Sequence, residues 1–298
     1  MYHGTYVDIT TLKYSLDPSG GVSWTAAETS RMLSVLEAVS RLIDAHTRRR
    51  FFVETATKYY DGTVGVGRVV DMYSERLTEY DSRLYVDDLL AVTSIAMDSD
   101  GDAAWEDTLA ATDYILHPYN SYPKNRIDLD LRQGDYSHWV VGQQAIKIVG
   151  QWGYGDGESA SPYKAAGATI TVATAGGTTL TASDGAKFAV GQTILMGSEQ
   201  AYITAISGNN LTAVRGVNGT TAAVQAAATA YIWCYPSTVQ EATLIQAARI
   251  WKRRDTPLGV AGDVALGEMR IGVPVPALDP DVKKLLESFY RPRVRGLA

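Results

Sequence analysis

The sequence predicts an α+β protein: a helical body that carries a sheet or hairpin region, with a small all-β barrel or sandwich inserted into it. Three observations support this fold class. Helical periodicity occurs near both ends of the chain, short strand-like runs follow the first helix, and a stretch without helical period separates these runs from the last helices. The length of 298 residues favours two domains over one.

The first predicted helix begins at a capping box. Thr25 precedes Glu28 by three residues, so its hydroxyl can accept a hydrogen bond from an orphan backbone N–H while the glutamate reaches back to the cap. The helix is expected to run to about His46 and to end in Arg48-Arg49-Arg50, whose charges suit the negative end of a helix dipole. Its apolar face comprises Met32, Leu33, Leu36, Val39, Leu42 and Ile43. Residues 1–24 are predicted to be a turn-rich arm.

A sheet or a set of hairpins is predicted after this helix. The strand-like runs, each bounded by turn residues, are Phe51–Tyr60, Arg68–Tyr73, Leu84–Val86, Val92–Met97, Tyr114–Leu116 and Ile127–Leu131. A further strand begins at Ile146 and ends in the turn sequence Trp152-Gly153-Tyr154-Gly155. The composition of the chain changes at this junction, so we interpret it as the point where the body is opened to admit the inserted domain.

The insert is predicted from composition and turn signals. Residues 157–235 are rich in Ala, Thr and Gly, carry few charges and lack helical periodicity. Ser207-Gly208-Asn209 and Asn218-Gly219 are strong hairpin turns, which favour a small all-β barrel or sandwich. The predicted domains are therefore a discontinuous body, residues 1–156 and 236–298, and an inserted all-β domain, residues 157–235.

Helical periodicity returns after Pro236. This helix is predicted to close with Lys252-Arg253-Arg254, and a linker rich in Gly, Val and Pro is expected over Gly259–Pro276. A short helix over Pro280–Tyr290 follows, because proline suits the first helical position. Residues 289–298 are predicted to form a basic, extended C-terminal arm.

Charge is unevenly distributed along the chain. The formal net charge is −6, which argues against an electrostatic nucleic-acid binder. Residues 1–159 carry 14 basic and 24 acidic groups, whereas residues 241–298 carry 10 basic and 7 acidic groups. Such an asymmetry suits a protein with two different neighbours, although solvated faces are its commoner cause.

The sequence contains no recognisable targeting or membrane-spanning segment. Cys234 is the only cysteine, so neither an intrachain disulfide nor a cysteine-based zinc site is expected. Residues 1–15 lack the pattern of a signal peptide, and no apolar run approaches the length of a membrane span. These features indicate a soluble protein made in a reducing compartment.

No catalytic, cofactor or metal site is predicted. Asp98-Ser99-Asp100-Gly101-Asp102 resembles the opening of a calcium loop, but Ala103 and Leu109 stand where an EF-hand needs glycine and a bidentate glutamate. A hairpin tip that carries acids is the favoured interpretation. The four histidines, His3, His46, His117 and His138, lack the spacing of metal ligands. Nucleophile-elbow, zinc-protease and phosphate-loop motifs are absent, so we expect a protein that is not an enzyme.

Aromatic and basic side chains are the candidates for partner contacts. Tyrosine and tryptophan are enriched at protein interfaces, although a core position explains them equally well. Helix-dipole complementation likewise explains the two basic triplets without any function. The predicted subunit or partner interface comprises Arg48, Arg49, Arg50, Lys252, Arg253, Arg254, Trp152 and Tyr154. The C-terminal arginines have no helix to complement as clearly, so the arm is expected to dock on an acidic partner.

Several short motifs follow one another in a particular order along the chain. After the capped helix come Tyr60-Asp61-Gly62, Val92-Thr93-Ser94-Ile95, Asp113-Tyr114-Ile115-Leu116 and Ile146–Tyr154, then Ala247-Ala248-Arg249, Lys252-Arg253-Arg254-Asp255 and Pro280-Asp281-Val282. In their order and spacing they resemble the head–tail connector (adaptor) family of tailed bacteriophages. The resemblance covers residues 25–155 and 236–298. Typical members pass from the Trp-Gly-Tyr turn to the last long helix through a short loop, so the insert lies outside it.

The resemblance implies a structural virion protein of the particle neck, made in the bacterial host cytoplasm. Such proteins form a ring, here of about twelve copies, under the portal protein; the ring extends the channel for double-stranded DNA and meets a downstream stopper or tail protein. It also implies that the C-terminal segment docks on the portal, through Phe289, Tyr290, Arg291, Arg293 and Arg295. An acidic body suits a channel through which DNA slides, because carboxylates repel phosphates. The alternative is a β module that decorates the neck or binds host glycan.

Overall fold

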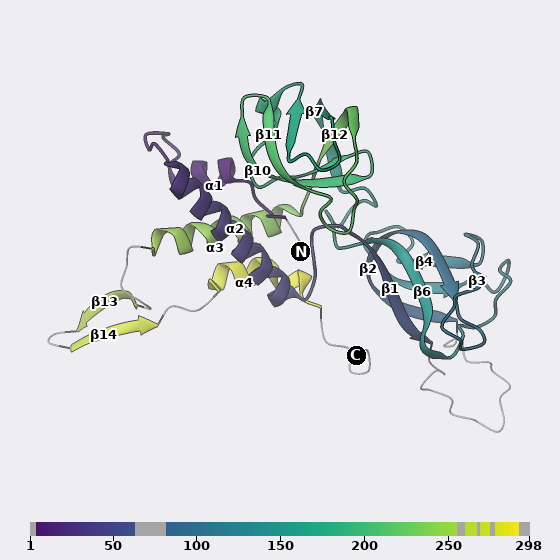
Figure 1. Ribbon diagram of the computed structural model, residues 1–298. Helices are drawn as coiled ribbons and strands as arrows, with labels where there is room; N and C mark the ends of the chain where they lie inside the picture. Colours follow the sequence, from purple (N-terminus) through teal and green to yellow (C-terminus); the bar gives the residue numbers. More distant parts are fainter. Residues whose placement is uncertain (1–3, 63–81, 255–259, 267–268, 275–277, 292–298) are drawn as a thin grey trace. The chain divides into compact units, whose positions relative to one another are not determined.

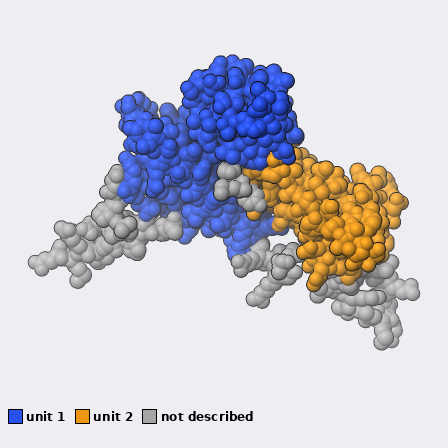
Figure 2. All heavy atoms as spheres, viewed as in Figure 1, with its two compact units in different colours: residues 1–49, 163–217, 221–298 blue, residues 50–162, 218–220 orange. Residues whose placement is uncertain are grey.

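The computed structural model describes residues 4–62, 82–254, 260–266, 269–274 and 278–291. The chain folds into two compact units, drawn in different colours in Figure 2. The first consists of residues 1–49, 163–217 and 221–298, and the second of residues 50–162 with 218–220. These units group the chain differently from the predicted domains, because the predicted insert shares a unit with the helices.

A group of packed helices forms one part of the first unit. The helices are α1 (Ile9–Leu16), α2 (Ala26–Thr47), α3 (Ser237–Lys252) and α4 (Pro280–Leu286), with the short 3₁₀ turn η2 (Glu287–Phe289) after α4. Helix α3 contacts each of the other three helices, and α1 also contacts α2 (Figure 1). Burial of one face of each helix, rather than intrinsic propensity, is what stabilises such short elements.

The predicted capping box at the start of α2 is confirmed. The Glu28 N–H donates to the Thr25 hydroxyl over 3.2 Å, and the Thr25 N–H donates to the Glu28 carboxylate over 2.9 Å. The backbone N–H and the hydroxyl of Thr25 both donate to the Glu28 carboxylate, and these hydrogen bonds hold the pKa of Glu28 below its ordinary value. At the other end, the helix ends at Thr47. The next residue, Arg48, is its C-cap and adopts the left-handed conformation with φ of 57°.

Residues 1–24 differ from the predicted turn-rich arm, because Ile9–Leu16 forms helix α1. Asp8 is its N-cap: the Asp8 carboxylate accepts hydrogen bonds from both the backbone N–H and the hydroxyl of Thr11. Ile9 and Leu12 are buried, which gives the helix an apolar anchor. The helix is short and its apolar residues are few, so periodicity alone is a weak signal for it.

A closed barrel forms the other part of the first unit. Its strands are β7 (Tyr163–Val172), β8 (Thr179–Ala182), β9 (Thr193–Met196), β10 (Glu199–Ser207), β11 (Asn210–Arg215) and β12 (Gln225–Trp233), with the 3₁₀ turn η1 (Gly185–Lys187) between β8 and β9. The strands follow the order β10-β11-β8-β7-β12-β9, and β9 pairs with β10 to close the circle. The prediction of a small all-β barrel in this stretch is confirmed.

The N-terminal segment ties the barrel to the helices within the first unit. The Thr5 hydroxyl donates to the Gly191 carbonyl over 2.7 Å, and the Ile9 N–H donates to the Val190 carbonyl over 3.0 Å. On its other side the same segment meets α2, because the Tyr6 N–H donates to the Ser40 hydroxyl over 3.2 Å. These buried contacts fix the barrel on the helices, so it is not a loosely tethered module.

The second unit is an open antiparallel sheet. Its strands are β1 (Glu54–Gly62), β2 (Arg83–Met97), β3 (Asp107–Thr108), β4 (Tyr114–His117), β5 (Lys124–Leu129) and β6 (Gly142–Trp152). The order is β1-β6-β2-β5-β4, with β3 beside β2. The runs Leu84–Val86 and Val92–Met97, predicted as separate strands, belong to the single long strand β2, whose pairing with β6 contains irregularities. The predicted run Arg68–Tyr73 lies outside the described residues. Because this unit is a sheet and the first unit also contains a barrel, the prediction of a helical body is not confirmed.

The Trp152-Gly153-Tyr154 turn is explained by a close approach of the backbone. Gly153 has φ of 139°, and a side-chain carbon there would lie 2.3 Å from the Phe52 carbonyl oxygen. The Gly153 N–H donates to the Asp88 carbonyl over 2.8 Å, so the turn is closed from the neighbouring strand β2. Only glycine satisfies both the conformation and the space at this position.

The prediction of a linker over Gly259–Pro276 is wrong for the described residues of this stretch. The structure forms a hairpin there, in which β13 (Val260–Leu266) pairs antiparallel with β14 (Met269–Pro274). Two β-rich runs with turn residues between them can pair locally, whereas composition alone suggested a linker. Within the described residues, no helix has both the length and the apolar character needed to cross a membrane.

Candidate functional site

The end of α2 holds the C-terminal segment in place. The Arg49 guanidinium donates from Nε to the Phe289 carbonyl over 2.8 Å, and the Arg291 N–H donates to the Thr47 carbonyl over 2.9 Å. The Arg48 guanidinium lies 5.1 Å from the centre of the Tyr290 ring, within cation–π range. The first basic triplet therefore meets the predicted docking segment, a contact between residues about 240 positions apart that the sequence reasoning missed.

A hollow of about 450 Å³ lies beside this segment. We call it the basic hollow; it is lined by His46, Pro280, Lys283, Lys284, Glu287 and Tyr290. Lys283 and Lys284 are exposed, and neither forms an ion pair with another described residue. With Arg48 packed on Tyr290, positive groups outnumber the single acid Glu287. A surface of this kind attracts an acidic partner.

The predicted docking residues have unequal access to a partner. Tyr290 is 45% exposed, whereas Phe289 is buried. Phe289 therefore anchors the segment to the protein and offers little surface of its own. Arg291 is partly buried and tied through its backbone to Thr47. Arg293 and Arg295 lie outside the described residues.

Arg50 and Arg254, also part of the predicted interface, have local partners. The Arg50 guanidinium donates to both carboxylate oxygens of Glu54, over 2.9 and 2.8 Å. Arg254 stacks on Trp251, with its guanidinium carbon 4.3 Å from the ring centre, and donates to the Trp251 carbonyl. Lys252 is exposed and Arg253 is partly buried at the end of α3. Helix-end packing thus accounts for most of these charges.

Trp152 and Tyr154 serve the sheet of the second unit. Trp152 is 1% exposed, its indole N–H donates to the Ala56 carbonyl over 2.9 Å, and the Lys58 ammonium lies 4.5 Å from its ring centre. Tyr154 packs on Phe51 with 5.4 Å between ring centres. Trp152 consequently has almost no surface left for a partner. Its large apolar ring stabilises the core because folding removes that ring from water.

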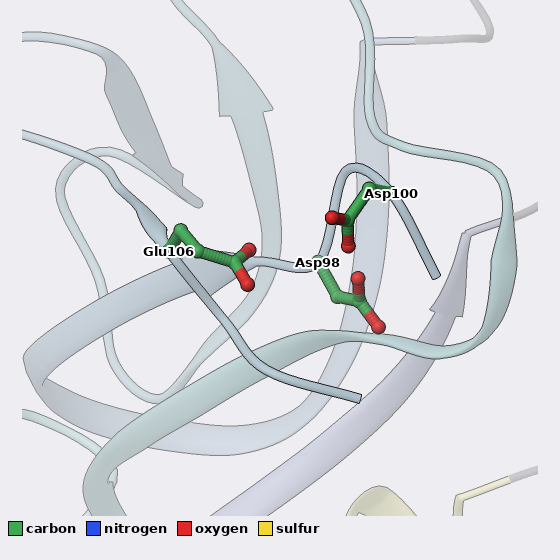
Figure 3. Close-up of side chains that lie close together, drawn as sticks. All are labelled: Asp98, Asp100 and Glu106. Atoms are coloured by element: carbon green, nitrogen blue, oxygen red, sulfur yellow. The ribbon is translucent and has the colours of Figure 1, made fainter. Parts of the chain in front are cut away.

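Three carboxylates, those of Asp98, Asp100 and Glu106, lie close together at the end of β2 and before β3. Carboxylate oxygens of Asp98, Asp100 and Glu106 lie within 4.8 Å of one another. Figure 3 shows these three side chains. The Asp98 carboxylate already accepts hydrogen bonds from the N–H groups of Gly101 and Ala103, over 2.7 and 3.0 Å. The carboxylate therefore stabilises its own turn, as expected of an acidic hairpin tip.

The described histidines lie in different surroundings. His117 is near Asp128, with 3.3 Å between its Nε2 and a carboxylate oxygen, and its ring meets Tyr119 edge-on. His138 contacts the Ser137 hydroxyl through Nδ1, and His46 lines the basic hollow. None of the three belongs to the carboxylate group around Asp98.

Comparison with known proteins does not assign the chain to a family. No family model matches the sequence, and no curated protein matches it. A solved structure described as "Neck of empty GTA particle computed with C6 symmetry" is similar over 98% of this chain and 92% of that chain, with 14% identity and a TM-score of 0.44. Neither the identity nor the TM-score of this pair is high enough to establish a shared fold.

Proposed function

We propose that the chain is a structural, non-enzymatic protein of a phage-like particle neck, where a ring of copies joins the portal to a downstream stopper or tail protein. The order of motifs in residues 25–155 and 236–298 is the sequence support for this role. The observation that carries the proposal is the basic hollow beside the C-terminal segment, since a connector needs a preformed surface for its neighbour.

The charge of the two units fits the same role. Residues 50–162 carry 9 basic and 19 acidic groups, whereas the rest of the chain carries 18 basic and 14 acidic groups. In the proposed ring, the basic hollow docks on an acidic surface of the portal. The acidic second unit repels the phosphates of passing DNA, so that the polymer is not retained in the channel.

The docking role is tested by charge reversal. The double variant Lys283→Glu/Lys284→Glu is expected to lower the affinity for purified portal by about tenfold or more, because two favourable charge contacts become repulsive. Both side chains are exposed, so the fold should persist, which circular dichroism checks. Arg31→Glu, an exposed change on α2 outside the basic hollow, is the control. Portal binding that is equal for the double variant and the control would contradict the proposed docking surface.

The ring itself is tested by electron microscopy of the protein bound to portal. The expected result is a closed ring of copies attached through the C-terminal side. A single copy bound per portal complex, or no attachment, would contradict the connector role. This outcome is separate from the charge-reversal result, which tests only the docking surface.

The glycan-binding alternative gains no support from the barrel. Such sites present exposed aromatic rings, yet Tyr202 is 1% exposed and donates its hydroxyl hydrogen to Glu37, and Trp233 is buried. Tyr231 is partly buried and packs against Tyr163 at 5.0 Å. We therefore propose no second function on this basis.

A further inference from the structure

One outer face of the sheet in the second unit carries an accessible pair of aromatic rings. Tyr59 of β1 lies opposite Lys147 of β6, whose neighbours Ile146 and Ile148 are buried in the core on the other face. Tyr59 is 44% exposed, and its ring centre lies 5.0 Å from that of Trp105, which follows β2 and is half-buried. Every described element of this unit is a strand, so none of its own helices covers the ring pair.

The ring pair is held in place by contacts with β6. The Trp105 indole N–H donates to the Gln144 carbonyl over 3.2 Å, and the Lys147 ammonium lies 5.1 Å from the centre of the Trp105 ring. The Gln144 N–H in turn donates to the Asp61 carboxylate over 2.8 Å. A partner that stacks on these rings therefore finds them already ordered, which lowers the entropy cost of binding.

Carboxylates lie around this ring pair. Asp61 is joined to it by the hydrogen bond just described, Glu106 is the residue after Trp105, and oxygens of Glu106 and Asp100 lie within 4.8 Å of each other (Figure 3). All three acids are exposed, and none forms an ion pair with another described residue. Lys147 supplies one positive charge against their three negative charges, so the surroundings of the rings attract a cationic group.

Rings and carboxylates together favour arginine among the possible cations. A guanidinium group stacks on aromatic faces and donates two parallel hydrogen bonds to a carboxylate, and it is more weakly hydrated than an ammonium group. A metal ion would use the carboxylates but not the rings. Arginine is also enriched at protein interfaces, so the cation that this surface fits is one carried by a protein.

We propose that this surface docks a basic, arginine-bearing segment of a partner protein. We call it the aromatic–acidic surface; it consists of Tyr59, Asp61, Asp100, Trp105 and Glu106. A guanidinium group stacks on the ring pair and donates to the neighbouring carboxylates, which also relieves the repulsion between Asp100 and Glu106. The aromatic–acidic surface belongs to the second unit and the basic hollow to the first, and the docking does not depend on the proposed neck function.

The proposal is tested by isothermal titration calorimetry of the full chain with three probes. They are a capped peptide of alternating glycine and arginine, the same peptide with lysine in place of arginine, and calcium chloride. We expect the arginine peptide to bind several-fold more tightly than the lysine peptide, and added salt to weaken both. Absence of binding by the arginine peptide would overturn the proposal, and heat with calcium chloride in that case would assign the carboxylates to a metal ion.

A double variant separates this surface from general attraction to an acidic protein. Asp100→Asn/Glu106→Gln removes two charges with little change of shape and should weaken binding of the arginine peptide by about tenfold or more. Glu158→Gln/Glu241→Gln is the matched control, because it removes two charges from exposed acids of other segments. Equal affinities of the two double variants for the arginine peptide would overturn the proposal.

A ring variant tests the aromatic half of the surface. Tyr59→Thr should weaken binding of the arginine peptide several-fold and change that of the lysine peptide much less, because stacking on the rings favours the guanidinium group. Threonine suits a strand, and Tyr59 is exposed, so the sheet should persist. An unchanged preference for arginine over lysine would overturn the stacking role of the rings. The charge variants at Asp100 and Glu106 decide the docking itself if Tyr59→Thr fails to fold.

Discussion

The barrel and the open sheet are both antiparallel, but they treat their strand edges differently. In the barrel, pairing of β9 with β10 and with β12 completes the circle, so the fold leaves no terminal strand. In the sheet, β1 and β4 stand at the two ends of the strand order. A terminal strand presents backbone groups that can pair with another chain, whereas a barrel is bound through its loops and side chains. Within the described residues, strand addition is therefore open to the second unit and not to the barrel.

The cores of the barrel and of the sheet differ in the size of their side chains. Apart from Phe188, the barrel core consists of Ala, Val, Ile, Leu and Met side chains, which suit a closed interior. The core of the sheet contains Trp139 and Trp152. The sheet core thus adds two tryptophan rings to aliphatic side chains, and each ring buries more apolar surface than any side chain of the barrel core. The barrel also contains a buried ion pair, between Arg215 and Glu199.

The largest expected effect is the loss of a ring from the sheet core. Trp152→Ala should lower the free energy of unfolding of the second unit by about 3–5 kcal/mol, because it removes a fully buried ring and leaves a cavity. The Ala56 carbonyl would also lose its indole donor. Hydrogen exchange measured by mass spectrometry should show faster exchange in β6 and in β1 and β2, the two strands that pair with it.

A conservative change in the barrel core provides the comparison. Ile170→Val removes one methylene group from a fully buried side chain and should cost about 0.5–1.5 kcal/mol. Its effect on exchange should be confined to peptides of the barrel. If Trp152→Ala changed exchange no more than Ile170→Val, the larger contribution expected of the tryptophan ring would be wrong.

The second effect concerns the buried ion pair of the barrel. Arg215 Nη2 donates to Glu199 over 2.6 Å and also to the Ala223 carbonyl over 2.6 Å, while Nη1 donates to the Gly177 carbonyl over 3.0 Å. Arg215→Met would leave a charged carboxylate with 0% exposure of its side chain and no cation beside it. We expect a loss of about 3 kcal/mol in the free energy of unfolding, measured by urea denaturation.

A pair with an exposed arginine, just after β5 in the second unit, is the matched control for this change. Arg132 binds Asp130 at 3.1 Å, but its side chain is 74% exposed. Arg132→Met should therefore cost less than about 1 kcal/mol. Equal losses for the two Arg→Met variants would mean that burial does not set the contribution of these ion pairs to stability.

Local features of the fold were predictable from the sequence because short-range physics decides them. The capping box needs only Thr25 and Glu28, and the barrel follows from turn signals and strand-length runs. Helix α1 was missed even though Asp8 stands at its N-cap with Thr11 three residues on, a signal that could have found it. The division of the chain into units depends on long-range packing through Thr5 and Val190, which single-sequence patterns do not encode.

The candidate site was predictable in composition but not in arrangement. The basic triplets and the C-terminal segment were identified from charge, yet the hydrogen bond from Arg49 to Phe289 brings together positions far apart in the chain. Charge patterning cannot distinguish an exposed lysine such as Lys283 from an arginine paired locally, such as Arg50. The unpaired indole N–H of Trp233 cannot be predicted from the sequence either, because being unpaired is a property of the packed structure.

The smallest expected effect is a pH dependence confined to the barrel. Burial alone would raise the pKa of Glu199, but hydrogen bonds from Arg215 and from the N–H groups of Ala223 and Gly216 outweigh it and hold the pKa below its ordinary value of 4.5. Its contribution to stability is thus present above pH 4.5 and is lost as the pH falls through the lowered pKa. We expect the free energy of unfolding of the barrel to decrease as the pH falls below 4.5, measured by urea denaturation with exchange in β10 and β11 as the local probe. Glu199→Gln should flatten this decrease. An equally steep pH profile in Glu199→Gln would contradict this prediction. The acid sensitivity would then arise from other carboxylates, such as those of the second unit.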